Sequence, residues 1–135
     1  MPVSYYIDAD RGIVVGRATG VVTASDIIEA FARLMAESKG QAAALPQLFK
    51  ADERASHHAM DLDGLKNVKE QMQVWRASAS VTAPVKHALV AANFVHDPVA
   101  PLWQAMTDAD PEMGIIVRVF PTEEAALAWL TEDET

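Results

Sequence analysis

The chain has 135 residues, of which 50% are hydrophobic and 22% charged, and its formal net charge is -8 at pH 7. This length and composition suit a single globular domain over residues 1–135, with no linker dividing it. The acidic balance disfavours nucleic acid as a partner, and the lack of cysteine excludes disulfides, thiolate zinc sites and thiol nucleophiles.

Two strands and a helix are predicted for the N-terminal part of the chain. Residues 3–8 alternate apolar and polar side chains, which is the pattern of a strand with two different faces. A turn containing Gly12 returns the chain into residues 13–19, so the two segments form an antiparallel hairpin. Thr23 then caps a helix over residues 24–38, whose apolar positions recur at three- and four-residue spacing.

The middle of the chain predicts a second strand–helix unit. Residues 45–51 form a third strand, and Pro46 belongs at or before its start because proline cannot donate to a sheet ladder. Helical spacing of apolar residues resumes over residues 61–77, with Asp61 or Asp63 as the N-cap.

A fourth strand and a third helix follow. Residues 85–92 form the fourth strand, and its part from Ala88 to Ala92 is apolar, as expected for a strand with both faces covered. The next helix begins at Pro98 or Pro101, since proline suits the first helical turn, and ends near Thr107.

The last part of the chain completes an α/β pattern. Residues 114–120 are rich in β-branched side chains and predict a fifth strand, and Thr122 caps a last helix that begins with Glu123 and Glu124. The order ββαβαβαβα predicts a mixed five-stranded sheet, mainly parallel with an antiparallel first strand, and four helices.

The chain resembles the STAS domain of bacterial anti-sigma-factor antagonists, and in particular a STAS-like group of small bacterial proteins. The resemblance rests on the element order and on the segments IDADRGIVVGRATGVVTASD and VRVFPTEEAALAWL. In the phospho-regulated antagonists, a kinase phosphorylates a serine at the start of the helix after the third strand. That serine is the first of two in an Asp-Ser-Ser-Gly motif. Here Asp61 and Gly64 match the Asp and Gly of the motif, but Leu62 stands at the position of the phosphorylated serine and Asp63 replaces the second serine. The resemblance therefore implies an interaction domain without this phosphorylation switch.

Polar and ionisable side chains follow the third and fourth strands. The carboxyl ends of parallel strands meet at one edge of a sheet, where ligands of α/β proteins bind. The resemblance also implies that a protein partner docks at the loop and helix on this edge. The candidate binding residues are Asp52, His57, His58, Asp61, Asp63, Lys66 and His96.

Three classes of function remain open at this point. The leading hypothesis is a non-catalytic, cytoplasmic protein-interaction domain that needs no cofactor. No secretory leader and no apolar run of about 18 residues is recognised, so we expect no insertion into a membrane. The second hypothesis is a small apolar-ligand domain, since the STAS fold resembles the lipid-transfer CRAL-TRIO architecture. An apolar pocket beneath the third helix would support it.

The third hypothesis is a metal-assisted hydrolase that uses His57 or His58 together with Asp61 and His96. It is disfavoured, because the spacing fits no known ligand motif and no nucleophile elbow or phosphate-binding loop occurs. His87 is interpreted as a strand residue without a role. The three tryptophans are interpreted as core or interface residues, and an edge strand makes a homodimer compatible with the sequence.

Overall fold

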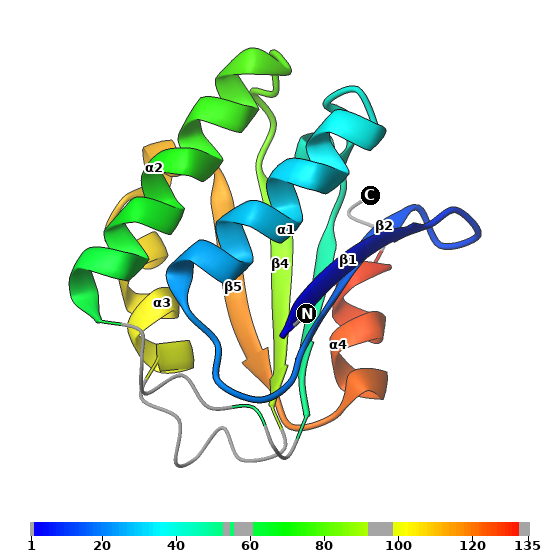
Figure 1. Cartoon of the computed structure of the whole chain (residues 1–135). Helices are drawn as coiled ribbons and strands as arrows, with labels where there is room; N and C mark the ends of the chain where they lie inside the picture. Colours follow the sequence, from blue (N-terminus) through cyan, green and yellow to red (C-terminus); the bar gives the residue numbers. More distant parts are fainter. Residues whose placement is uncertain (1, 53–54, 56–60, 92–98, 133–135) are drawn as a thin grey trace.

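The five predicted strands form one mixed sheet (Figure 1). The computed structural model describes residues 2–52, 55, 61–91 and 99–132. The strands lie in the order of the chain: β1 (Val3–Asp8), β2 (Ile13–Ala18), β3 (Gln47–Ala51), β4 (Val85–Ala91) and β5 (Ile115–Phe120). β1 pairs antiparallel with β2, and every other pair of neighbours is parallel. The predicted mixed sheet with an antiparallel edge strand is therefore confirmed.

Four α-helices in the described ranges alternate with the parallel strands, as the sequence predicted. They are α1 (Ala24–Glu37), α2 (Leu62–Ser78), α3 (Val99–Asp108) and α4 (Glu123–Leu130), with short 3-10 helices η1 (Gln41–Ala44) and η3 (Pro111–Met113). The third strand begins at Gln47 rather than at residue 45, because the chain first makes η1. Pro46 precedes the strand as expected, and its carbonyl accepts a hydrogen bond of 2.8 Å from the amide of Val14. Residue 98, one of the two predicted starts of the third helix, lies outside the described residues.

The helices cover the two faces of the sheet unequally (Figure 1). α1, α2 and α3 share one hydrophobic core with one sheet face, and Phe49 of β3 belongs to this core. Three successive right-handed crossovers in a sheet ordered like the chain place their helices on the same face. α4 follows the last strand and packs on the opposite face, where Ala126 and Leu130 lie against Leu48 and Ala88.

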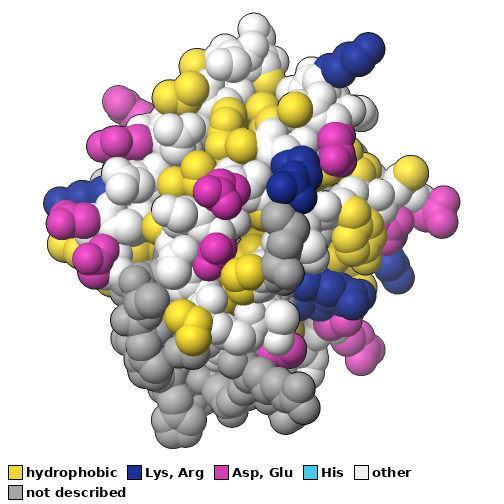
Figure 2. Space-filling view, in the orientation of Figure 1, with side chains coloured by type: hydrophobic (Ala, Val, Ile, Leu, Met, Phe, Trp, Pro, Cys, Tyr) yellow, Lys and Arg dark blue, Asp and Glu magenta, His cyan; other side chains and the backbone are white. Residues whose placement is uncertain are grey.

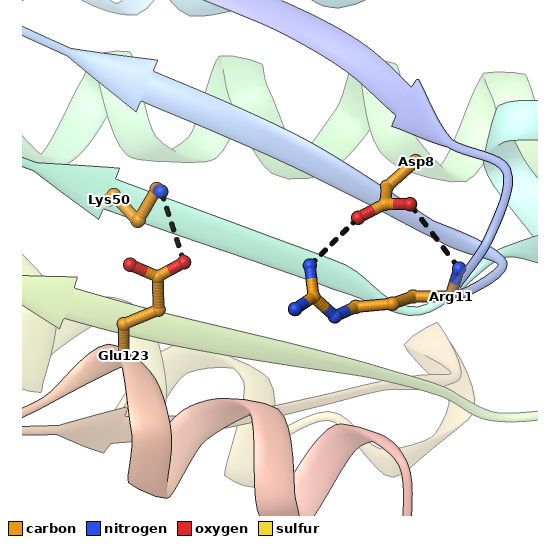
Figure 3. Close-up of polar contacts among 4 residues, drawn as sticks. All are labelled: Asp8, Arg11, Lys50 and Glu123. Carbon is orange, nitrogen blue, oxygen red and sulfur yellow. Dashed lines mark hydrogen bonds and ion pairs between the residues drawn. The ribbon is translucent and has the colours of Figure 1, made fainter.

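Two ion pairs lie on the surface of the sheet, one between β3 and α4 and one at the β1–β2 turn (Figure 3). Lys50 of β3 and Glu123 of α4 form an ion pair with an N–O distance of 3.2 Å, and Arg11 reaches back to Asp8 at 3.0 Å across the β1–β2 turn. Each pair has at least one substantially exposed side chain, so each contributes only about 0 to 1 kcal/mol. The space-filling view shows acidic and basic side chains interspersed over the face that α1 and α2 cover (Figure 2).

Aromatic side chains gather where β1 and β3 meet α1. The ring of Tyr5 stands edge-on to that of Phe31 at 5.1 Å between centroids and lies 5.9 Å from that of Phe49. Gly16 is the β2 partner of both Tyr5 and Phe49, and a Cβ at Gly16 would collide with both rings. The absence of a side chain at this one position lets two rings from neighbouring strands lie across β2.

Candidate functional site

The carboxyl edge of the parallel sheet is where the sequence placed its candidate residues. Ala51 of β3 and Ala91 of β4 are register partners, so the two strands end side by side. Asp52 follows directly, and its amide donates a 3.0 Å hydrogen bond to the carbonyl of Ala18. Asp52 therefore lies at the predicted edge. His57, His58 and His96 lie outside the described residues, and their part in a site stays a prediction.

The start of α2 contains the other three candidates, Asp61, Asp63 and Lys66, all with exposed side chains. Asp61 is the N-cap of α2, because its Oδ1 accepts a 2.8 Å hydrogen bond from the amide of Gly64. The sequence predicted either Asp61 or Asp63 as the N-cap of this helix, and in the structure the N-cap is Asp61. Asp63 lies in the first turn, where a carboxylate is favourable beside the positive end of the helix dipole.

A metal centre has no support from the part of the chain that the structure describes. Within residues 2–52, 55, 61–91 and 99–132, no group of three or more His, Asp or Glu side chains is placed to hold an ion. The metal hypothesis needed histidines that fall outside these ranges. None of the helices in the described ranges has the length and hydropathy needed to cross a membrane.

An apolar cavity lies between the sheet and the helices α2 and α3, with a volume of about 80 Å³ and partial access to solvent. We call it the α2–α3 pocket. β1 and α1 add single residues to its wall, and α3 covers it from one side. Its described lining residues are Tyr5, Ile27, Gln47, Phe49, Ala51, Leu65, Val68, Met72, His87, Leu89, Val90, Val99, Ala100 and Trp103. A cavity beneath the third helix is the observation that would support the second hypothesis.

Three polar side chains interrupt this apolar wall. Gln47 and His87 are register partners on β3 and β4, so their side chains leave the sheet on the same face, and the two residues are only 4% and 8% exposed. The phenol of Tyr5 shares a hydrogen bond with the side chain of Gln47. Among the described residues, Oε1 of Gln47 is buried and has no hydrogen-bond partner. This oxygen is enclosed by the surrounding protein atoms and is not exposed to the space of the pocket.

The polar side chains in the described wall of the pocket are electrically neutral at pH 7. Burial, together with a smaller effect of the positive charge on Arg76, lowers the pKa of His87 to about 3. Burial also raises the pKa of the Tyr5 phenol, although the hydrogen bond with Gln47 opposes part of that shift. No Asp, Glu, Lys or Arg is among the described lining residues. The described wall thus offers hydrogen bonds and apolar contact but no charge.

Arg76 lies behind His87, at a second and much smaller cavity of about 20 Å³. The residue is 8% exposed, and its Nη2 donates a 2.9 Å hydrogen bond to the carbonyl of Ala83. Gly114, with φ of 75°, leaves the space that the guanidinium occupies, since a Cβ there would collide with it. Nη1 of Arg76 is buried without a partner among the described residues. Arg76 thus fixes the loop before β4 and acts on the α2–α3 pocket through the charge it places near His87.

Sequence reasoning missed the polar part of this pocket. His87 was interpreted as a residue without a role, and Tyr5 and Gln47 were not singled out. Gln47 is a long polar residue in an apolar strand, two positions from Phe49 and hence on the same face, which is a usable signal. One other interpretation fits: Trp103 is buried in the core, as expected of the tryptophans.

The fold and the cavity define an α/β protein with a five-stranded mixed sheet and a pocket under two helices whose described wall carries no charge. A scan of protein-family models found no match to this chain, and neither did searches of curated proteins and of solved structures. Membership of the STAS-like group stays a prediction from the sequence.

Proposed function

We propose that this chain is a STAS-like, non-catalytic domain that binds a small, mainly apolar molecule in the α2–α3 pocket. The observation that supports this function best is a cavity walled by aliphatic and aromatic side chains in which a few buried polar groups converge. Pockets that bind small molecules have this composition. Removing apolar surface from water supplies the affinity, and the polar groups orient the ligand.

The size of the cavity limits the ligand. An apolar cavity of roughly 150 Å³ holds a benzene ring, and the α2–α3 pocket has about 80 Å³. It therefore takes a short alkyl chain or the edge of a ring, and the rest of a larger molecule extends toward the opening. A carrier of whole phospholipids does not fit this volume.

Filling the pocket tests the proposal. Ala100 is a buried lining residue of α3, and Ala105 is an exposed alanine on the same helix. With hexan-1-ol as probe, two-dimensional NMR of the native protein should show saturable shifts at Trp103, Val68 and Leu89. Ala100→Leu should weaken this binding at least about tenfold, as expected when a ligand loses its space, and Ala105→Leu should change it less than about twofold.

Two outcomes would contradict the pocket. The first is the absence of saturable shifts in the native chain at millimolar probe. The second is equal affinity in the native chain and in Ala100→Leu, which would place the probe elsewhere on the protein.

A second function rests on a different surface. Leu62, which stands where the antagonists carry their phosphorylated serine, is 48% exposed at the start of α2 beside exposed Asp63 and Lys66. Single exposed apolar residues are common, but an apolar side chain bordered by charged ones has the arrangement of a protein interface, which has an apolar centre and a polar rim. We propose this α2 N-terminal surface, formed by Leu62, Asp63 and Lys66, as the docking site of a protein partner.

Charge reversal tests the docking site. Lys66→Glu should reduce recovery of a partner from native lysate several-fold relative to the native chain. Lys39→Glu is the matched control, because Lys39 is an exposed lysine in the turn between α1 and η1, before β3 begins. Asp61 is a poor target here, since changing it removes the N-cap of α2. Equal recovery with Lys66→Glu and Lys39→Glu would remove this surface from consideration.

A further inference from the structure

We propose that this chain forms a two-fold symmetric homodimer, in which β1 of one copy pairs antiparallel with β1 of a second copy through Tyr5, Tyr6 and Ile7. The proposed interface uses the backbone of β1 and does not depend on ligand binding in the α2–α3 pocket. β1 and β5 form the two edges of the sheet (Figure 1). The support for the dimer is a difference between these two edge strands.

Alternate residues of β1 direct their backbone groups away from the sheet. The carbonyl of Pro2, directly before β1, accepts a 2.8 Å hydrogen bond from the amide of Thr19, directly after β2. Because hydrogen-bonded and non-bonded positions alternate in an antiparallel pair, Tyr5 and Ile7 direct their N–H and C=O groups outward. Within the described ranges, nothing hydrogen-bonds to these outward groups. Val3 also faces outward but is only 2% exposed, so the accessible part of the edge contains Tyr5 and Ile7.

The opposite edge of the sheet is covered by a charged side chain. The amide of Val85 bonds to the carbonyl of Gly114, and the alternation of directions along β5 then points the carbonyl of Val117 away from β4. Nη1 of Arg118 donates a 2.6 Å hydrogen bond to this outward carbonyl and another of 3.1 Å to Oδ1 of Asp108. A charged side chain on an edge strand hinders pairing with a further strand.

β1 lacks the features that protect edge strands. Its sequence, VSYYID, contains no lysine, arginine or proline, and its register with β2 has no bulge. Its one charged residue, Asp8, stands at the end of the strand and forms an ion pair with Arg11 at 3.0 Å. Tyr6 is 46% exposed on the sheet face opposite α1. Of the two edges, β1 is therefore the one that can accept another strand.

A second copy of this chain is the partner that the register favours. Residues with outward groups pair with each other, so Tyr5 of one copy lies opposite Ile7 of the second copy, and each such pair exchanges two hydrogen bonds. Two-fold symmetry repeats the contact and closes the assembly at two copies. The exposed Tyr6 side chains then lie opposite each other. Asp8 lies opposite Ser4 of the second copy, so no like charges meet.

The small size of the interface sets its strength. A pair of short strands buries less surface than the roughly 1,200 to 2,000 Å² of a stable protein interface. We therefore expect a dissociation constant on the order of 100 μM, and concentrations from about 20 μM to 1 mM cover the transition.

Sedimentation velocity of the native chain and two variants tests the dimer. The native chain should change from monomer to dimer over this concentration range. Tyr6→Lys places two like charges opposite each other and should weaken association at least about tenfold. Gln73→Lys adds the same charge at an exposed position of α2 and should change association less than about twofold. The dispersion of the NMR spectrum confirms that each variant is folded.

Amide hydrogen exchange of the native chain locates the interface. Between 20 μM and 1 mM protein, exchange at Tyr5 and Ile7 should slow about threefold, because pairing supplies acceptors for their outward amides. Exchange at Val119, an outward amide of β5, should not change.

Three outcomes would overturn the dimer. The first is a native chain that stays monomeric at 1 mM. The second is concentration-dependent protection at Val119 instead of Tyr5 and Ile7, which would place the contact on β5. The third is equal association of the native chain and Tyr6→Lys. The first two are measured on the native chain and need no variant.

Discussion

Gln47 on β3 and His87 on β4 are direct neighbours in the parallel register, and both side chains are buried in the wall of the pocket under α2 and α3. Two polar residues side by side in a sheet core are unfavourable for stability unless they have hydrogen-bond partners. Both residues lie on the sheet face that lines the cavity. Four predictions test the parts of the fold that build this arrangement.

The first prediction concerns the protonation of His87. Its folded-state pKa of about 3 lies below the unfolded value of about 6.5. The unfolded chain therefore binds a proton that the folded chain excludes at any pH between these values. The contribution of neutral His87 to the free energy of unfolding is fully present above about pH 6.5. Below that pH, the free energy of unfolding falls by up to about 1.4 kcal/mol per pH unit.

Urea denaturation of the native chain and of His87→Gln at pH 7, 6 and 5 measures this effect. The free energy of unfolding of the native chain should fall by about 2 kcal/mol more than that of the variant between pH 7 and pH 5. The carboxylates titrate in both proteins and cancel in the difference. Identical pH dependence in the two proteins would mean that His87 is accessible to protons in the folded state.

The second prediction concerns the close approach at Gly16. A methyl group at this position would meet the rings of Tyr5 and Phe49, the latter at 2.7 Å. Gly16→Ala should therefore lower the free energy of unfolding by about 1 to 3 kcal/mol through overpacking. A double-mutant cycle with Tyr5→Ala provides the control, because much of the penalty should vanish when the ring is absent. Additive effects of the two changes would contradict the collision.

The third prediction concerns the support of Arg76 by Gly114. Gly114→Ala combines backbone strain at φ 75° with displacement of the buried guanidinium. Gly12→Ala is a matched control, since Gly12 has φ of 66° and a methyl group added to it would have no atom within 4 Å. Strain alone should cost about 1 kcal/mol at either site, and Gly114→Ala should cost about 1 to 3 kcal/mol more. Equal losses in urea titrations would show that the guanidinium moves aside freely.

The fourth prediction concerns the cap of α2. Asp61→Ala removes the acceptor for the amide of Gly64 and should destabilise the fold by about 1 kcal/mol, whereas Asp61→Asn keeps an acceptor and should cost only a few tenths. Thermal or urea unfolding of the two variants measures the difference. A loss of similar size in both variants would indicate that the charge of Asp61, rather than its hydrogen bond, stabilises the helix.

The order of elements was predictable because it depends on local signals. Period-two alternation over residues 3–8, helical spacing over residues 61–77 and the caps at Thr23 and Thr122 are each encoded within a few neighbouring residues. The start of β3 was less well predicted, since η1 ends only at Ala44, three residues before the strand. Helix and strand boundaries depend on competing hydrogen bonds that periodicity alone does not resolve.

The candidate site was predictable only in its general location. Placing Asp52 and the start of α2 at the carboxyl edge follows from the topology of parallel sheets. The α2–α3 pocket was foreseen only as a condition for the second hypothesis, and its polar residues were not identified. Gln47 and His87 are 40 positions apart in the sequence, and no local pattern predicts that they become neighbours on adjacent strands.

The sequence by itself thus determined which segments become strands and helices, their order, and the absence of thiol chemistry. Only the tertiary structure decided that α1, α2 and α3 share one face, that Gln47 lies beside His87, and that a cavity remains between them and Trp103. Periodicity and capping are properties of neighbouring residues. The register of distant strands and the space left between packed side chains depend on the whole fold.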